Sequence, residues 1–184
     1  MTKIIALDLS KRSTGWAVWD EGWDMPRYGS VQLGSEFTCD GRTYIKLHQV
    51  LSDLRATLTK FETIYFEEPI NPNALSGHTN IDTLRVLAGL AAHTLSYASA
   101  LGLRAQAVNI TSWRRHFVGK MPRGTKSKEW KEYAIERCQQ YGWKPRKDDE
   151  ADALGILDYG CELQGVTPPW RIDETLRAPL GVRA

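Results

Sequence analysis

The segment that decides the expected fold is KIIALDL at residues 3–9, an almost uninterrupted apolar run of the length of a buried strand. It is followed by TGWAVWD at residues 14–20, where aromatic and β-branched side chains predict a second strand. Residues 27–33 predict a third strand. Because only short connections separate these segments, we expect the three strands to form an antiparallel meander.

Helical and strand patterns alternate after the meander. Apolar residues at helical spacing predict an amphipathic helix over 42–60, and a fourth strand follows over 62–68. The next predicted elements are an Ala- and Leu-rich helix over 81–101 and a strand over 103–109. Three further helices are expected: one through Phe117 capped by Thr111 or Ser112, one over 127–141 capped by Ser127, and one over 149–163. This order predicts an α/β fold, with a five-stranded mixed sheet of three antiparallel and then parallel strands, and helices on both faces.

The length and composition are those of one globular domain. The chain has 184 residues, of which 42% are hydrophobic and 25% charged, and it shows no internal repeat or dividing linker. We expect a folded domain over residues 1–164 and an irregular tail over 165–184. No apolar run approaches the roughly 18 residues of a membrane span, and the N-terminal residues lack the features of a signal peptide.

The cysteines and histidines indicate neither a disulfide framework nor a zinc site. The three cysteines are odd in number and lack metal-ligand spacing, and the four histidines are scattered. We therefore expect reduced thiols in a cytoplasmic protein.

Carboxylates gather at the ends of apolar segments. Asp8 ends the first strand, Glu67 and Glu68 end the fourth, and the last helix begins with further acids at Asp148, Asp149, Glu150 and Asp152. Each place alone is compatible with a turn, a solvated strand end or a favourable helix dipole. Together they predict converging carboxylates if the first and fourth strands are neighbours. Divalent cations relieve the repulsion between such groups, and two Mg²⁺ ions about 4 Å apart promote phosphodiester hydrolysis.

The residues around these acids resemble the three motifs of the RuvC-type Holliday junction resolvases. IALDLS with STGWA resembles the first motif, YFEEP the second and DEADALGI the third, and motif order and intervals match over residues 3–164. The resemblance implies an RNase H-like nuclease domain over 1–164 that acts in DNA recombination and repair. It implies an endonuclease that cleaves branched DNA, most of all four-way junctions, with two Mg²⁺ or Mn²⁺ ions in each active site. The catalytic, metal-binding acids would be Asp8, Glu67, Asp149 and Asp152.

The sequence departs from the family pattern in three places. Pro69-Ile70-Asn71 stands where the family often has an aromatic residue that holds the junction open. The doubled acids at 67/68 and 148/149 leave the alignment open by one residue, and Asp148 is a possible helix cap. The third motif is more similar to phage-encoded members, some of which cut several branched DNA forms.

A basic cluster precedes the last helix. Residues 114–131 contain seven basic residues and one acid, Glu129, which predicts a phosphate-binding surface. Arg114 falls where the family has a DNA-contacting basic residue, and Lys126 or Lys128 falls near a second. The expected DNA-binding residues are Arg114, Arg115, Lys126 and Lys128. We interpret most of the interleaved aromatic residues as core.

The helix expected over 81–101 is apolar around about 240° of its circumference, more than packing on one sheet requires. We expect this helix to form a homodimer, with Leu90 and Tyr97 on the shared face. The resolvases that the chain resembles dimerise through the helix after the second motif. Coverage by the tail or by a neighbouring helix is the alternative.

Three other functions stay open. An RNase H-like nuclease that cuts RNA, RNA–DNA hybrid or other DNA structures would use the same acids. An actin-like or sugar-kinase-like ATPase shares the strand order but needs two related domains and a second phosphate-binding hairpin. A non-catalytic junction-binding protein would gain nothing from the carboxylates.

Overall fold

The structure of the chain, a computed structural model, describes residues 1–69 and 81–172. Its centre is a five-stranded sheet in the order β3-β2-β1-β4-β5. The strands are β1 (Lys3–Asp8), β2 (Thr14–Asp20), β3 (Arg27–Val31), β4 (Thr63–Glu67) and β5 (Arg104–Val108). β1, β2 and β3 pair antiparallel, whereas β4 is parallel to β1 and β5 is parallel to β4. The expected mixed sheet, with its meander, is confirmed.

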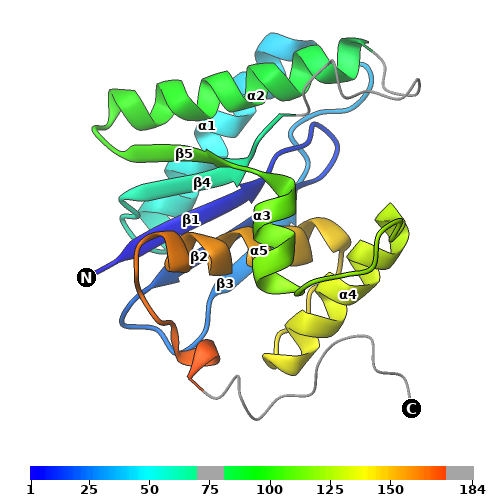
Figure 1. Cartoon of the computed structure of the whole chain (residues 1–184). Coiled ribbons are helices and arrows are strands. Elements are labelled where there is room, and N and C mark those ends of the chain that lie inside the picture. Colours follow the sequence, from blue (N-terminus) through cyan, green and yellow to red (C-terminus); the bar gives the residue numbers. More distant parts are fainter. Residues whose placement is uncertain (70–80, 173–184) are drawn as a thin grey trace.

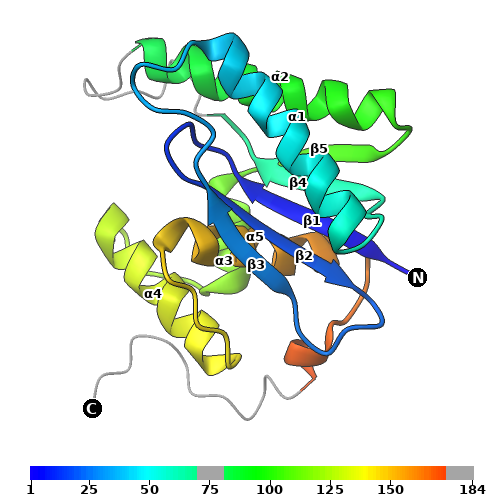
Figure 2. The ribbon, with the colours of Figure 1, turned by 180° about the vertical axis from the view of Figure 1, so that it is seen from behind.

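Helices cover both faces of the sheet (Figures 1 and 2). The helices are α1 (Asp40–Thr57), α2 (Ile81–Ala100), α3 (Ile110–Phe117), α4 (Ser127–Gln140) and α5 (Asp148–Leu163). α1 and α2 pack on one face with Ile5 and Leu7, and the other three helices pack on the opposite face with Ile4 and Ala6. β1 is therefore buried on both sides, which explains its uninterrupted apolar sequence. Trp16 and Trp19 of β2 also face opposite layers, as strand periodicity requires.

Helix ends differ from the expected ones by a few residues, and two expected caps are wrong. α1 begins at Asp40 and ends at Thr57. Asn109, and not Thr111 or Ser112, caps α3, because its side chain accepts a hydrogen bond from the Thr111 backbone N–H at 2.9 Å. In α4, Ser127 is the first helical residue, and the preceding Lys126 N–H donates to the Glu129 carboxylate at 2.6 Å. The sequence pattern identified these helices, but side-chain geometry decides their caps.

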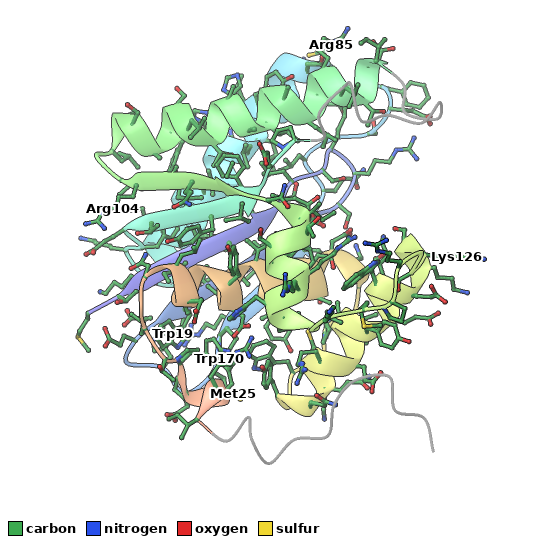
Figure 3. The ribbon with its side chains drawn as sticks, viewed as in Figure 1. Trp19, Met25, Arg85, Arg104, Lys126 and Trp170 are labelled. Carbon is green, nitrogen blue, oxygen red and sulfur yellow. The ribbon has the colours of Figure 1, made fainter. Side chains whose placement is uncertain are left out.

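The tail is not irregular throughout, because Pro169–Arg171 forms a single 3-10 turn. Trp170 in this turn is buried, and its ring meets that of Trp19 edge to face at a centroid distance of 5.3 Å (Figure 3). A buried aromatic ring gives this short segment enough apolar contact to order it. The domain boundary at residues 164/165 stays a prediction, and the tail from 173 onward lies outside the described residues.

The orientation of α2 contradicts one expectation. Leu90 and Tyr97, expected on a shared subunit face, are buried inside the molecule against the sheet and α1. The neighbouring helix α1 covers part of the wide apolar arc, and the ring of Tyr44 stacks on that of His93 at 4.4 Å. What stays exposed on α2 includes Ile81 and Leu95, at 74% and 47% of their full exposure.

No helix within the described ranges is long and apolar enough to cross a membrane. The three cysteines are free thiols in the structure, with Cys138 and Cys161 buried. The expected cytoplasmic location stays a prediction.

Candidate active site

Two neighbouring parallel strands bring the first two acids together. Leu7 of β1 pairs with Phe66 of β4, so the next residues, Asp8 and Glu67, lie side by side where the two strands end. Both side chains are partly buried at this edge. The sheet topology alone therefore unites two residues that are far apart in the sequence.

The first turn of α5 adds the other two acids to this edge. Asp8 pairs with Gly15 of β2, and a Cβ atom at Gly15 would overlap the backbone carbonyl of Asp149. Only glycine allows the helix to approach β2 this closely. The Thr-Gly that opens the second strand thus has a structural reason, because it lets Asp149 and Asp152 reach Asp8.

Burial, helped at Asp8 and Asp152 by the charges of neighbouring carboxylates, raises the pKa of three acids of the cluster, Asp8, Glu67 and Asp152. Burial, followed by the charges of Asp152, Glu67 and Asp149, raises the pKa of Asp8 well above its ordinary value. Burial is also the main cause that raises the pKa of Asp152 to about 7, against the opposing charge of Arg114. Burial raises the pKa of Glu67 as well, although Trp113 and Arg114 counteract it. Without a cation, the cluster is a repulsive arrangement of buried carboxylates.

In each of the two pairs of neighbouring acids, 67/68 and 148/149, the two side chains have different surroundings. Asp148 forms an ion pair with Lys131, and this hydrogen bond lowers the pKa of Asp148. It is not the helix cap, since Lys147 occupies the capping position and α5 starts at Asp148. Glu68 is exposed, whereas its neighbour Glu67 is partly buried beside Asp8. These differences favour Glu67 and Asp149 as members of the site.

Glu150, which follows Asp149, has a structural contact. Its carboxylate accepts hydrogen bonds from the Ser30 hydroxyl at 3.0 Å and from the Arg146 backbone N–H at 2.8 Å. These hydrogen bonds hold the start of α5 against β3 and against the loop that precedes α5.

The four expected DNA-binding residues have different surroundings. Arg114 faces the acids, with a guanidinium nitrogen 3.9 Å from Asp152 Oδ2, and it packs over the rings of Trp113 and Trp130 at 5.2 and 5.9 Å. Arg115 is exposed on the same helix. Lys126 and Lys128 are exposed at the start of α4, where Lys126 projects outward (Figure 3). Arg114 thus belongs to the acidic site, while the other three belong to the surface beside it.

Two residues that contact the acids of the candidate site escaped the sequence analysis. Lys131 was part of the basic cluster, but its contact with Asp148 requires α4 to pack on α5. Trp113 was interpreted as core, and it is fully buried, yet its indole Nε1 also donates to Glu67 Oε2 at 3.0 Å. In the sequence Lys131 was visible only as one member of that cluster, and nothing local distinguished it from the other basic residues. No local signal exists for the second.

A pocket of about 270 Å³ opens at Asp8 and Glu67, the two acids of the strand ends. Its lining residues include Asp8, Ser10, Glu67, Pro69 and Thr83. A second pocket, of about 230 Å³, lies between α3 and α4 and is lined by Arg114, Arg115, Lys120 and Trp130 among others. The first pocket is lined by carboxylates and the second by basic side chains, and Arg114 of the second pocket lies 3.9 Å from Asp152 of the acidic cluster.

The donor set fits a hard divalent cation. Within the described residues, no group of three or more His, Cys, Asp or Glu side chains is placed so that it could hold a metal ion as it stands. The converging groups, however, all present carboxylate oxygens, which Mg²⁺ and Mn²⁺ prefer. Their mutual repulsion is the penalty that a bound cation would remove.

Comparison with known proteins shows the fold and little sequence similarity. No protein-family model matches the chain, and no curated protein matches it. RuvC from Thermus thermophilus in complex with a Holliday junction substrate is similar in structure, with a TM-score of 0.61 and 16% identity over 92% of this chain and 99% of that one. Another Thermus thermophilus RuvC structure gives 0.63 and 18% over 91% and 99%. The yeast mitochondrial Holliday junction resolvase gives 0.56 and 12% over 84% and 75%. The RNase H-like fold expected from the motifs is confirmed.

Proposed function

We propose that this protein is a metal-dependent endonuclease that cleaves branched DNA, above all four-way junctions. The observation that supports this best is the convergence of Asp8, Glu67, Asp149 and Asp152 at the ends of β1 and β4 and the start of α5. Structural likeness to resolvases, one of them in complex with a Holliday junction, supports the choice of substrate.

The four acids would hold two Mg²⁺ or Mn²⁺ ions, which supply an activated water and stabilise the leaving oxygen when bound. Asp8 and Glu67 approach from the strands, and Asp149 and Asp152 from the helix. Arg114, 3.9 Å from Asp152, is placed to neutralise charge on the scissile phosphate. Lys131 keeps Asp148 in an ion pair and so out of the set.

The surface beside the site would position the DNA. Arg115, Lys126 and Lys128 are exposed on α3 and at the start of α4, and Arg115 lines a pocket together with Arg114. Side chains of this kind bind phosphates without regard to sequence, which suits recognition of a DNA shape. The fork opening that an aromatic residue performs in the family has no counterpart at Pro69.

We also propose a homodimer through the exposed face of α2, which includes Ile81 and Leu95. Two symmetric active sites would then nick two strands of one junction. Leu95→Glu should yield a monomer without unfolding the chain, because the side chain is 47% exposed. Light scattering at micromolar concentration measures this, and a wild-type mass of one 20.8 kDa chain with and without junction DNA would exclude the dimer.

The substrate is tested by a cleavage assay with Mg²⁺. The assay compares a four-way junction with a fork, a flap, a linear duplex and an RNA–DNA hybrid of the same sequence. We expect fastest cleavage of the junction. Preference for the hybrid would replace the proposed substrate by RNA–DNA, and the same acids would serve both.

A further inference from the structure

Trp113 is a buried aromatic residue with a polar contact in the acidic site. It lies in α3, has no exposed surface, and donates its indole Nε1–H to Glu67 Oε2 at 3.0 Å. A buried indole usually finds such a partner, but here the partner is a carboxylate of the proposed catalytic set. The contact therefore connects the hydrophobic core directly to the site.

The ring is fixed on its other side by α5. A Cβ atom at Gly155 would lie 2.8 Å from the Trp113 ring and 2.9 Å from the ring of Phe117. Glycine at this position lets α3 pack closely on the helix that supplies Asp149 and Asp152. The indole is thus held by the same helix whose acids must meet Glu67.

The Glu67 carboxylate needs a contact with a neighbouring group to fix its orientation. It is the last residue of β4, it is only partly buried, and a glutamate side chain has three rotatable bonds. The hydrogen bond from Trp113 fixes Oε2 and leaves Oε1 available to a cation. The same indole also supports Arg114, whose guanidinium lies 5.2 Å from the ring centroid and 3.9 Å from Asp152.

We propose that Trp113 is a positioning residue, which holds the Glu67 carboxylate in the orientation that binds the cation. The inference rests on the proposed function, since it assumes that Glu67 is a metal ligand. Contacts that orient metal ligands typically change metal affinity by roughly 10- to 100-fold when they are lost.

The chain contains a matched control. Trp143 is 1% exposed and belongs to the same hydrophobic cluster as Trp113, but its Nε1 has no hydrogen-bond partner. Trp143→Phe therefore removes the same ring volume from the same core without removing a hydrogen bond. Trp113→Phe removes both.

The experiment measures Mn²⁺ binding to the full chain by calorimetry, together with the melting temperature. We expect Trp113→Phe to weaken Mn²⁺ binding about tenfold and to raise the Mn²⁺ concentration for half-maximal cleavage by the same factor. Trp143→Phe should melt at a similarly lowered temperature and bind Mn²⁺ within about twofold of wild type. Equal losses in both variants, or unchanged binding in Trp113→Phe, would overturn the inference and leave Trp113 a packing residue.

A second measurement does not depend on either variant being stable. In the wild-type chain labelled with ¹⁵N, the Trp113 indole N–H signal should shift when Mg²⁺ is added, and that of Trp143 should not. A Trp113 signal that stays unchanged while Mg²⁺ binds would overturn the inference. Cation binding without cleavage of any branched DNA would overturn only the proposed function, whereas a wild-type chain that binds no Mn²⁺ would overturn both.

Discussion

Helix α5 contains two buried aspartates with opposite surroundings. Asp152 lies among other carboxylates, and burial raises its pKa to about 7 although Arg114 stands 3.9 Å away. Asp158, further along the helix, accepts hydrogen bonds from Trp170 at 2.7 Å and Arg171 at 2.9 Å, and its other oxygen lies 3.2 Å from His116 Nε2. Burial alone would raise the pKa of Asp158, but His116 and Arg171 hold it below its ordinary value.

The difference separates a structural acid from a prepared ligand. The charge of Asp158 is fully compensated by donors within the chain, so nothing is left for a ligand. The charge of Asp152 is disfavoured mainly by burial, Arg114 offsets only part of this, and Glu67 and Asp148 add repulsion, so this carboxylate gains most from a cation supplied from outside. Removing Asp158 should therefore damage the fold, and removing a member of the other cluster should damage only the chemistry.

The largest expected effect is the loss of catalysis at the acidic cluster. Asp8→Asn and Glu67→Gln each remove one charge with almost no change in shape. We expect each to lower cleavage by about a thousandfold or more, equivalent to ~4 kcal/mol of transition-state stabilisation. Junction binding should persist, because the proposed phosphate contacts come from other residues. A variant with near wild-type rate in Mg²⁺ would remove its residue from the catalytic set.

The next effect concerns the fold. Asp158→Asn leaves Arg171 and His116 without their buried carboxylate, so we expect about 3 kcal/mol or more to be lost from the free energy of unfolding. Urea denaturation measures this, and cleavage per folded molecule should stay within a few-fold of wild type. Unchanged stability would show that the cluster around Asp158 contributes nothing to holding the turn at Trp170.

The free energy of unfolding at acid pH tests the same difference between Asp158 and Asp152. Because the folded pKa of Asp158 is depressed, its contribution to stability is present above the ordinary value of 3.8 and is lost as the pH falls through the folded pKa. Between pH 5 and pH 3 we therefore expect wild type to lose more unfolding free energy than Asp158→Asn, by about 1 kcal/mol. Identical losses would mean that the pKa of Asp158 is not lowered.

A smaller effect on cleavage should distinguish Asp149 from Asp148, the two neighbouring acids at the start of α5. Asp148 is paired with Lys131, and Asp149 lies against Gly15 at the strands. Asp149→Asn should therefore lower cleavage by at least about tenfold more than Asp148→Asn, a difference of ~1.4 kcal/mol. Rates measured under saturating Mg²⁺ decide this, and the reverse order would shift the site by one residue.

The smallest effect is expected at the DNA-binding surface. Lys128→Ala and Arg115→Ala each remove one exposed charge from the surface beside the site. Each lost phosphate contact should reduce the slope of log K against log salt by about one. Unchanged slopes in both variants would place the DNA on another surface.

The strands and the acids could be predicted because their signals are local. An apolar run that ends in Asp8, and an acid three positions before Asp152, are visible without knowledge of the fold. Contacts between segments that are far apart in the sequence could not be predicted in this way. The hydrogen bond from Trp113 to Glu67 joins positions 46 apart, and the pairing of Arg171 with Asp158 orders a segment expected to be irregular.

The orientation of α2 could not be predicted from the sequence either. Its wide apolar arc indicated excess hydrophobic surface but not which part α1 would cover. Leu90 and Tyr97 turned inward because α1 and the sheet both require apolar partners, and Leu95 stayed exposed. Periodicity gives the width of a face, and only packing decides which residues remain at the surface.

The most direct test places the two aspartates of α5 in one assay. Wild type, Asp152→Asn and Asp158→Asn are incubated with a labelled four-way junction and Mg²⁺, at a temperature where all three are folded, and the products are resolved on a denaturing gel. We expect wild type and Asp158→Asn to nick the junction, and Asp152→Asn to bind it without cutting. Cleavage by Asp152→Asn at the wild-type rate would contradict the assignment of the acidic cluster as the active site.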